Sequence, residues 1–319
     1  MSSYESEFQD KRCLVTGGAG FIGSNLSRRL ALIGAKVLAI DDFSTGKKNN
    51  IVDFESLGIK FINADISNQE KTSQYFSQVD LVFHQAAVPS VPRSIEDPMS
   101  TNNSNIKGTL SVLENSRLNK VKKVVYAASS SAYGDTETLP KTEAMLPLPL
   151  SPYAVQKLTG EMYCKTYFDN FNLRTTSLRY FNVYGPFQDP GSEYSAVIPI
   201  FITQALANNT IVINGDGSTS RDFTFIDDVI QANLRAAIST KSDGFVINIA
   251  YGESFTLTDL ANKIVKKTGS KSDITYAPFR KGDVLHSLAD LSRTKKLISY
   301  NPQFNLSAGL DKTIEFYKT

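Results

Sequence analysis

The chain of 319 residues has no tryptophan, only two cysteines and only two histidines. Cys13 and Cys164 each lie in an apolar segment, and two cysteines cannot supply a disulfide framework, so we expect a reducing, cytoplasmic location. His84 and His286 have no cysteine or carboxylate beside them at a spacing typical of metal ligands. The sequence therefore predicts neither a disulfide-stapled secreted fold nor a metal centre.

Charge of one sign and long apolar runs are also missing. Lys and Arg total 34 against 32 Asp and Glu, a formal net charge of +2, with no long run of one sign to attract a polyanion. The short basic cluster Lys120, Lys122 and Lys123 is typical of a solvated helix end. No 18 consecutive residues are apolar, and residues 1–10 have no signal-peptide core. We therefore expect no nucleic-acid partner, no membrane insertion and no export.

The chain does contain a series of short apolar, β-branched runs separated by helical patterns. Their hydrophobicity is continuous rather than alternating, which indicates strands covered on both faces, as in a parallel sheet flanked by helices. The repetition predicts an α/β fold with a doubly wound parallel sheet of the Rossmann type. The expected strands are 13–15, 37–40, 61–62, 81–83, 124–127 and 176–178.

The pattern changes after about Tyr180, where connections become rich in proline, glycine and asparagine. This change predicts a smaller α+β lobe, which we interpret as the substrate-binding part. Residues 245–249 predict a strand that returns to the sheet, so this lobe is discontinuous in sequence. We expect a Rossmann domain at 1–180 with a returning segment near 224–250, and the second lobe at 181–223 and 251–319.

A glycine-rich turn follows the first expected strand. Glycines at 17, 20 and 23 permit a tight turn, close approach of backbone N–H groups to a pyrophosphate, and close packing of the next helix. Asp41, at the tip of the second strand, can accept hydrogen bonds from a ribose 2′-hydroxyl but would repel a 2′-phosphate, which favours NAD over NADP. Asp65 at the end of the third strand is expected to hold the adenine edge, with capping of the following helix as the alternative.

Tyr153 and Lys157 are four residues apart and would share one face of a helix. Such a pair arises by chance in a chain of this composition, so its weight comes from its position. It follows the fifth strand, whose end carries Ser129, and ligands of open α/β sheets bind beyond these strand ends. A nearby ammonium and a positive nicotinamide ring would lower the pKa of the Tyr153 phenol toward that of a usable base, with Ser129 holding the reacting oxygen.

Four segments together resemble the extended short-chain dehydrogenase/reductase family, and within it the UDP-hexose 4-epimerases, particularly the branch acting on UDP-N-acetylglucosamine. They are 17–23 (GGAGFIG), 129–134 (SSSAYG), 151–157 (SPYAVQK) and 178–186 (LRYFNVYGP). The resemblance implies 4-epimerisation through a transient 4-keto sugar, with tightly bound NAD that is regenerated in each turnover. It also implies that Tyr153 is the acid and base, that Lys157 holds the nicotinamide ribose, and that Ser129 contacts O4 of the sugar.

The resemblance further implies two sets of binding residues. Those expected to hold NAD are Gly17, Gly20, Phe21, Ile22, Gly23, Asp41, Asp42, Ser44, Thr45, Gly46, Asp65, Ile66, Ala86, Ala87 and Tyr180. Those expected to hold the UDP-sugar are Ser90, Ser130, Asn182, Ala196, Val197, Asn214, Arg221, Arg280, Asp283 and Ser287.

Within the second set, Arg221 and Arg280 are expected to grip the diphosphate, because a planar guanidinium can bind two phosphate oxygens at once. The alternative is that they pair with Asp222 and Asp283 on the surface. Ser287 stands where relatives restricted to UDP-glucose and UDP-galactose carry a tyrosine. A small residue there leaves room for a 2-acetamido group, so Ser287 predicts tolerance of N-acetylated sugars.

Other activities of the same fold remain open. A nucleotide-sugar 4,6-dehydratase would need carboxyl groups where Ser130 and Ser131 stand. UDP-glucuronate or UDP-N-acetylglucosaminuronate 4-epimerisation and UDP-glucuronate decarboxylation depend on details of the pocket, and a non-catalytic NAD-sensing protein would normally lack Tyr153 or Lys157. The resemblance also implies a homodimer formed through helices expected at about 98–119 and 153–171.

Overall fold

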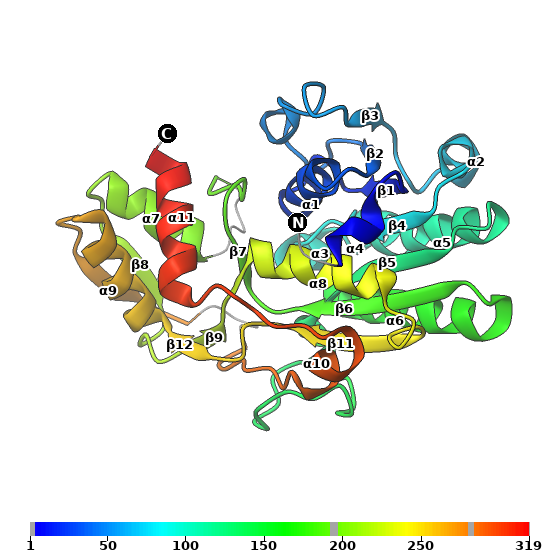
Figure 1. Ribbon diagram of the computed structural model, residues 1–319. Coiled ribbons are helices and arrows are strands. Elements are labelled where there is room, and N and C mark those ends of the chain that lie inside the picture. The colour runs from blue at the N-terminus through cyan, green and yellow to red at the C-terminus, as the bar shows by residue number, and fades with distance from the viewer. Residues whose placement is uncertain (1–3, 192–196, 280–283, 319) are drawn as a thin grey trace.

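The computed structural model describes residues 4–191, 197–279 and 284–318. Within these residues, seven parallel strands form one sheet in the order β11-β6-β5-β4-β1-β2-β3 (Figure 1). The order runs outward from β1 in both directions, which confirms the predicted doubly wound arrangement. The strands are β1 (Arg12–Thr16), β2 (Lys36–Asp41), β3 (Lys60–Asn63), β4 (Leu81–His84), β5 (Lys123–Ser129), β6 (Arg174–Tyr180) and β11 (Phe245–Ile249).

Successive residues of the central strands pack into two separate hydrophobic clusters. On β1, Cys13 and Val15 belong to one cluster together with Leu26 of the first helix, whereas Leu14 belongs to the other together with Val112 of a helix on the opposite face. Helices therefore cover both faces of the sheet. This cover is the physical reason for continuous rather than alternating hydrophobicity in the strands.

The covering helices begin and end close to the expected positions, with one interruption. The helix expected at about 98–119 is divided by a π-helical turn, Asn103–Lys107. The buried Asn105 in this turn accepts a hydrogen bond from the backbone N–H of Val88 and donates one to Gln156. The helices around the sheet are α1 (Phe21–Leu32), α2 (Gln69–Ser73), α3 (Val91–Glu96), α4 (Pro98–Asn102), α5 (Gly108–Leu118), α6 (Pro152–Phe171), α8 (Ile226–Ile238) and α10 (Ser292–Ile298).

Most of the other described elements lie beside the sheet, on the left in Figure 1, in the part of the chain that the sequence predicts as the second lobe. Three short strand pairs connect its segments: β7 (Val183–Tyr184) with β10 (Thr224–Phe225), β8 (Ile211–Asn214) with β13 (Ile274–Ala277), and β9 (Ser220–Asp222) with β12 (Ser254–Thr256). Its helices are α7 (Val197–Leu206), α9 (Leu257–Thr268) and α11 (Leu306–Lys318). The chain returns from this lobe to the sheet at β11, which pairs with β6 as the sequence predicts.

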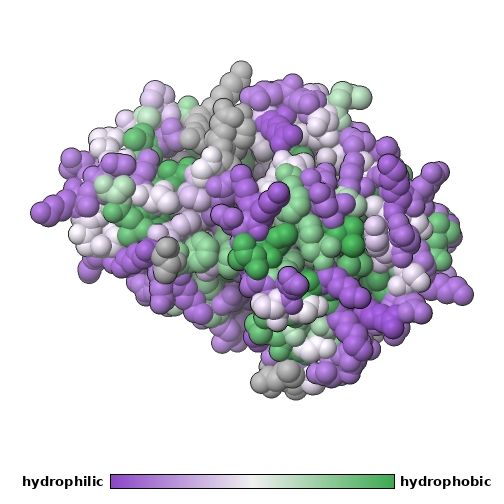
Figure 2. Space-filling model, turned by 90° about the horizontal axis from the view of Figure 1, so that it is seen from above, coloured by the Kyte–Doolittle hydropathy of each residue, from purple (hydrophilic) through white to green (hydrophobic). Residues whose placement is uncertain are grey.

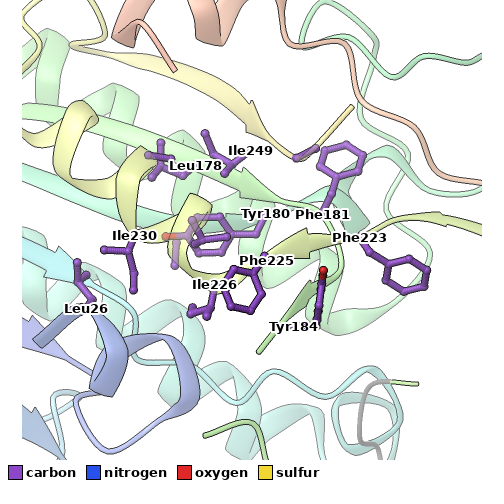
Figure 3. Packing of buried hydrophobic residues seen from close by; sticks show 14 of the residues in the cluster. Leu26, Leu178, Tyr180, Phe181, Tyr184, Phe223, Phe225, Ile226, Ile230 and Ile249 are labelled. Carbon is purple, nitrogen blue, oxygen red and sulfur yellow. The ribbon is translucent and has the colours of Figure 1, made fainter. Parts of the chain in front are cut away.

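Aromatic side chains join the sheet to the second lobe. The rings of Phe223 and Phe225 lie 6.4 and 5.6 Å from that of Tyr184, both edge to face, beyond the end of β6 (Figure 3). All three side chains are buried. Edge-to-face pairs have a defined geometry, so this cluster fixes the residues that follow β6 relative to the sheet.

The basic cluster of Lys120, Lys122 and Lys123 differs from the expected solvated cluster at one position. Lys123 is buried rather than solvated, and its ammonium pairs with Asp243 at 2.7 Å.

On the face shown in Figure 2, hydrophilic side chains cover most of the outline and hydrophobic ones gather in smaller patches. In the part of the chain that the structure describes, no helix is both long and apolar enough to cross a membrane.

Candidate active site

A cavity of about 880 Å³ extends along the carboxyl ends of the sheet strands, from the glycine loop after β1 to Ser287 in the second lobe. It brings together most of the residues that the sequence predicts for binding and catalysis. The predicted residues that line it are Gly17, Gly20, Phe21, Ile22, Gly23, Asp41, Asp42, Ser44, Thr45, Asp65, Ile66, Ala86, Ala87, Ser90, Ser129, Ser130, Tyr153, Lys157, Tyr180, Asn182, Arg221 and Ser287.

The glycine loop fits a dinucleotide because its backbone adopts a conformation and a close packing that leave no room for side chains. Gly17 has a φ of +70°, and a Cβ atom there would lie 2.7 Å from the backbone nitrogen of Ala86. A Cβ atom on Gly23 would collide with the carbonyl oxygen of Gly17. Helix α1 starts directly after Gly20, so its first N–H groups point toward the cavity. This cradle suits a pyrophosphate.

Asp41 closes the cofactor end of the cavity. Its carboxylate accepts hydrogen bonds from the backbone N–H groups of Ala19 at 3.0 Å and Phe43 at 2.8 Å, so it braces the glycine loop as well as lining the cavity. Burial raises the pKa of Asp41, and these hydrogen bonds oppose the rise. Gly46 does not line the cavity; a Cβ atom there would lie 2.6 Å from Oδ1 of Asp41, so Gly46 makes room for this carboxylate.

Asp65 lines the cavity beside Ile66 and does not cap the following helix. Its two carboxylate oxygens accept from the backbone N–H and the hydroxyl of Ser67, at 2.7 and 2.8 Å. The cap of α2 is Asn68, whose side chain accepts from the backbone N–H of Lys71. The alternative in which Asp65 is a helix cap is therefore wrong.

The predicted catalytic residues come together where β5 ends and α6 begins. Ser151 caps α6 by accepting from the backbone N–H of Ala154, and the helix then places Tyr153 and Lys157 one turn apart at the cavity wall. The ammonium of Lys157 donates to the carbonyl oxygen of Ala127, at 2.8 Å. Burial lowers the pKa of Lys157 to about 8.

The electrostatics at Tyr153 differ from the expectation. Burial raises the pKa of the phenol, and the hydrogen bond with Ser129 is the group that opposes the rise. The expected lowering by the ammonium of Lys157 is not found. Ser129 is itself held in place, because its oxygen accepts from the hydroxyl of Ser131 at 2.9 Å. In the protein alone, Ser129 is therefore the partner that favours phenolate.

At the other end of the cavity, two predicted substrate residues contact each other. The amide nitrogen of Asn182 donates to the hydroxyl oxygen of Ser287 at 3.1 Å, and the backbone N–H of Asp222 donates to the same oxygen at 3.3 Å.

The Asp222 carboxylate is fully buried and accepts from backbone N–H groups, including that of Ala289. Asp222 is therefore not a surface partner of Arg221, whose guanidinium donates to the carbonyl oxygens of Ser220 and Leu285 at 3.0 Å.

Some predicted residues are not brought to the cavity, and others lie outside the described residues. Val197 begins α7 and Asn214 ends β8, and neither lines the cavity among the residues that the structure places. Ala196, Arg280 and Asp283 lie outside the described residues.

Sequence reasoning missed a set of lining residues that come from loops. Lys47, after β2, pairs with Asp189 at 3.1 Å, and Asn50 donates to the carbonyl oxygens of Ala19 and Phe187. These residues join the segment after β7 to the glycine loop across the cavity. No short motif marks them, because each contact joins residues far apart in sequence.

The fold and the site define a class: a doubly wound α/β protein with a dinucleotide cradle and a Ser, Tyr and Lys set at its strand ends. The comparisons with known proteins agree. The family model described as the NAD dependent epimerase/dehydratase family matches residues 13–250. The chain belongs to this family, which confirms the predicted NAD cofactor, and the epimerases to which it is similar support the predicted isomerase class.

Individual relatives are similar over nearly the whole chain. A UDP-glucose 4-epimerase of Mycolicibacterium smegmatis is 37% identical, with 96% of this chain and 98% of the relative covered. The structure of a UDP-N-acetylglucosamine 4-epimerase from Methanobrevibacter ruminantium, in complex with UDP-N-acetylmuramic acid, is 38% identical, with 97% and 99% covered and a TM-score of 0.93. That of a UDP-glucuronic acid 4-epimerase from Bacillus cereus, with UDP-glucuronic acid and NAD, is 35% identical, with 96% and 99% covered and a TM-score of 0.88.

Proposed function

We propose that the protein is an NAD-dependent UDP-hexose 4-epimerase whose preferred substrates are UDP-N-acetylglucosamine and UDP-N-acetylgalactosamine. Ser287 carries this proposal. It lines the cavity, and its small side chain is held by Asn182 and the backbone of Asp222. A serine leaves space that a tyrosine would fill, and the larger acetamido sugar can use that space.

The residues of the site take distinct roles in this reaction. Tyr153 removes the proton from the 4-hydroxyl of the sugar and later returns it, with Ser129 holding the reacting oxygen. Lys157 supplies a positive charge that favours phenolate once the site is filled. NAD, which the glycine loop and Asp41 would hold, would supply reversible hydride transfer at C4 of the sugar. Residues that retain NAD between the forward and the reverse transfer are therefore as necessary as those that bind the sugar.

The diphosphate is proposed to bind between the two lobes. Arg221 lines the cavity, and its guanidinium is planar and can bind two phosphate oxygens. Asn182, on the segment after β6, provides an amide at the same end of the cavity. Arg280 and Asp283 are proposed to complete this set, with Ala196 toward the uridine.

The competing reactions make different demands on the end of β5. Elimination of water by a 4,6-dehydratase requires an acid and a base beside the catalytic serine. The side chains there are Ser130 and Ser131, and the hydroxyl of Ser131 donates to Ser129. Hydroxyls at these positions support epimerisation over dehydration, whereas UDP-glucuronate stays an alternative substrate because one of the similar structures holds it.

We also propose a homodimer formed through the helices on the α6 side of the sheet. Several apolar side chains of α3, α4 and α6 are exposed: Ile95 by 63%, Met99 by 79%, Val155 by 46% and Met162 by 58%. Val155 and Met162 are seven residues apart and therefore share one face of α6. A second copy packed on this face would bury them.

The proposed function is tested by incubating the purified protein with UDP-N-acetylglucosamine, without added cofactor, and following the anomeric proton signals by NMR. We expect signals of UDP-N-acetylgalactosamine to grow to a constant ratio. UDP-glucose and UDP-glucuronate serve as comparison substrates under the same conditions. Conversion of a plain hexose or of the uronate alone would contradict the proposed substrate, and no conversion of any of the three would contradict the proposed function.

A further inference from the structure

A second buried ion pair lies directly behind the catalytic residues, between Glu161 of α6 and Arg179 of β6. The Nε and Nη2 atoms of Arg179 donate to the two carboxylate oxygens of Glu161, at 2.9 and 2.7 Å. The side chains of Arg179 and Glu161 are only 4% and 3% exposed. The guanidinium carbon of Arg179 also lies 4.5 Å from the centre of the Tyr133 ring, which lines the cavity. The pair is therefore buried, held by two hydrogen bonds and next to the site.

Stability alone does not account for such a pair. Removing two charges from water costs about as much free energy as their attraction returns, and apolar side chains of the same volume often serve the fold better. A buried bidentate pair beside a reaction site therefore points to another role. On the same helix, Lys157 lies four residues before Glu161 and is also buried.

Helix α6 relates these residues by its geometry. Tyr153, Lys157 and Glu161 follow at intervals of four, so they form one stripe along the helix. Lys157 and Glu161 are both buried on this stripe. The Lys157 ammonium has a carbonyl oxygen, that of Ala127, and the face of the Tyr126 ring as its close neighbours. Neither neighbour carries a charge, so the cation needs an anion from elsewhere.

Several titratable groups surround Lys157, and Glu161 is the anion among them. They come from four elements: Tyr153, Glu161 and Cys164 of α6, Tyr126 of β5, His84 of β4 and, behind Glu161, Arg179 of β6. Burial lowers the pKa of Lys157 to about 8, and Cys164 and Glu161 oppose this shift. Burial raises the pKa of the Cys164 thiol to about 12, so that thiol is neutral in the working range. Burial likewise lowers the pKa of His84 to about 3, which leaves the imidazole neutral.

Arg179 acts on Glu161 rather than on Lys157. Burial raises the pKa of the Glu161 carboxyl, and the hydrogen bonds from Arg179 oppose the rise and favour the carboxylate. The guanidinium also fixes the carboxylate in place through its two parallel hydrogen bonds.

We propose that Glu161, held by Arg179, is a positioning residue that keeps Lys157 protonated in its buried position. This inference rests on the proposed role of Lys157 in the reaction. Replacing water by a fixed carboxylate lets the site exclude solvent from the reacting sugar without losing the cation that Tyr153 needs.

The test measures the protonation of Lys157 directly. Protein labelled with ¹³C at lysine Cε is titrated by NMR, and the signal of Lys157 is assigned through its loss in Lys157→Met. We expect a midpoint near 8 in the native protein. Glu161→Gln keeps the shape of the side chain and removes its charge, and we expect it to lower the midpoint by about one pH unit. The alkaline limb of the kcat profile should move to lower pH by the same amount.

A matched control is available at the other end of the sheet. Asp243 pairs with the buried Lys123 at 2.7 Å and with Arg174 at 2.6 Å, at the starts of β5 and β6. Asp243→Asn therefore removes a carboxylate from a buried ion pair far from the strand ends that carry the site. We expect it to lower the melting temperature as Glu161→Gln does, and to leave the Lys157 midpoint and the kcat profile unchanged.

Each outcome decides the inference. A folded Glu161→Gln protein with an unmoved Lys157 midpoint would overturn it, and so would an equal shift in Asp243→Asn. If Glu161→Gln does not fold, the double variant with Arg179→Gln removes the unpaired cation, and a smaller downward shift is expected; no shift there overturns the inference. Because the NMR titration needs no substrate, its result stands even if the protein does not epimerise UDP-sugars.

Discussion

Tyr153 is the residue on which the proposed chemistry depends most. Its phenol lines the cavity, interacts with Ser129 and has a pKa raised by burial, so it stays protonated until a filled site favours phenolate. We expect Tyr153→Phe to lower kcat by about 10²–10⁴-fold, the usual contribution of a positioned acid and base. Bound NAD, measured by absorbance after denaturation, should be unchanged. Near-native turnover would remove Tyr153 from this role.

In the proposed function, Ser287 decides the size of the sugar that the site accepts. We expect Ser287→Tyr to reduce kcat/KM for UDP-N-acetylglucosamine by about tenfold or more while UDP-glucose is affected less, because the ring would occupy the acetamido space. Ser287→Ala is the matched control, since it removes the hydroxyl without adding volume. Steady-state kinetics on both substrates measure the ratio, and equal losses on the two sugars would refute the pocket argument.

His84 gives the fold a specific dependence on pH. It is fully buried between the hydroxyls of Thr16 and Thr109, and burial, followed by the charge of Lys157, lowers its pKa from 6.5 to about 3. A lowered pKa means that the unfolded chain takes up the proton first. The contribution of the buried, neutral His84 to the free energy of unfolding is therefore complete above pH 6.5 and is lost as the pH falls toward 3.

We therefore expect the free energy of unfolding of the native protein to fall between pH 6 and 4 relative to that of His84→Asn. The limiting slope from one proton is about 1.4 kcal/mol per pH unit. Urea unfolding at several pH values measures both proteins. Parallel pH dependences in the two would show that His84 does not titrate in this way.

At this scale the sequence predicted residues whose partners are near in the chain and missed those whose partners are distant. A single strand, turn or helix determines the place of each of these predicted residues: the glycine loop, Asp41, Tyr153 and Lys157. Lys123 looked solvated because its partner, Asp243, comes from a loop after α8. No local pattern reveals such a pair.

Among the elements, α6 matters most because it carries Tyr153, Lys157 and Glu161. Its first turn depends on Ser151, which accepts from the backbone N–H of Ala154. We expect Ser151→Ala to cost about 1 kcal/mol of stability, as loss of a helix cap usually does. It should also lower kcat, because the frayed turn is the one that holds Tyr153. Thermal unfolding and steady-state kinetics measure the two effects.

Helix α9 supplies the control for this prediction. Its cap, Thr256, accepts from the backbone N–H of Asp259 in the second lobe. Thr256→Ala should lower the melting temperature about as much as Ser151→Ala and leave kcat unchanged. If the two variants have the same kcat, the first turn of α6 does not position Tyr153.

The sequence predicted the elements of the sheet well and those of the second lobe poorly. Continuous apolar runs are typical of strands buried on both faces, and β1, β2, β4, β5 and β11 carry runs of three or more apolar residues. The strand pairs of the second lobe are two to four residues long. Segments that short have no periodicity to detect. The π-helical turn before α5 was missed because it depends on packing of Asn105 against Val88 rather than on composition.

For the whole molecule, the proposed dimer gives a direct prediction. Met162 is 58% exposed on the outer face of α6, so Met162→Lys would place a charge in the proposed interface. We expect sedimentation velocity to report a dimer for the native protein and a monomer for this variant. Val212→Lys is the control, because Val212 is exposed by 42% in the second lobe. A native monomer, or a dimer that Met162→Lys leaves intact, would contradict this interface.

The division into lobes rests on composition alone, because connections become rich in proline, glycine and asparagine after Tyr180. The boundaries at 180, 223 and 250 and the cytoplasmic location stay predictions. The cavity, by contrast, is lined by residues from both parts of the chain, including Gly17 and Ser287. An active site of this kind forms only when the sheet and the segments after β6 are assembled, so no single stretch of sequence contains it.

The central claim is that hydrogen leaves C4 of the sugar and returns to the same carbon without exchange with water. UDP-N-acetylglucosamine deuterated at C4 tests this claim most directly, with the purified protein, no added cofactor and analysis of the product by mass spectrometry and NMR. We predict UDP-N-acetylgalactosamine that keeps the deuterium at C4 through repeated turnovers. Product with hydrogen from solvent at C4, or deuterium moved to another carbon, would contradict the account.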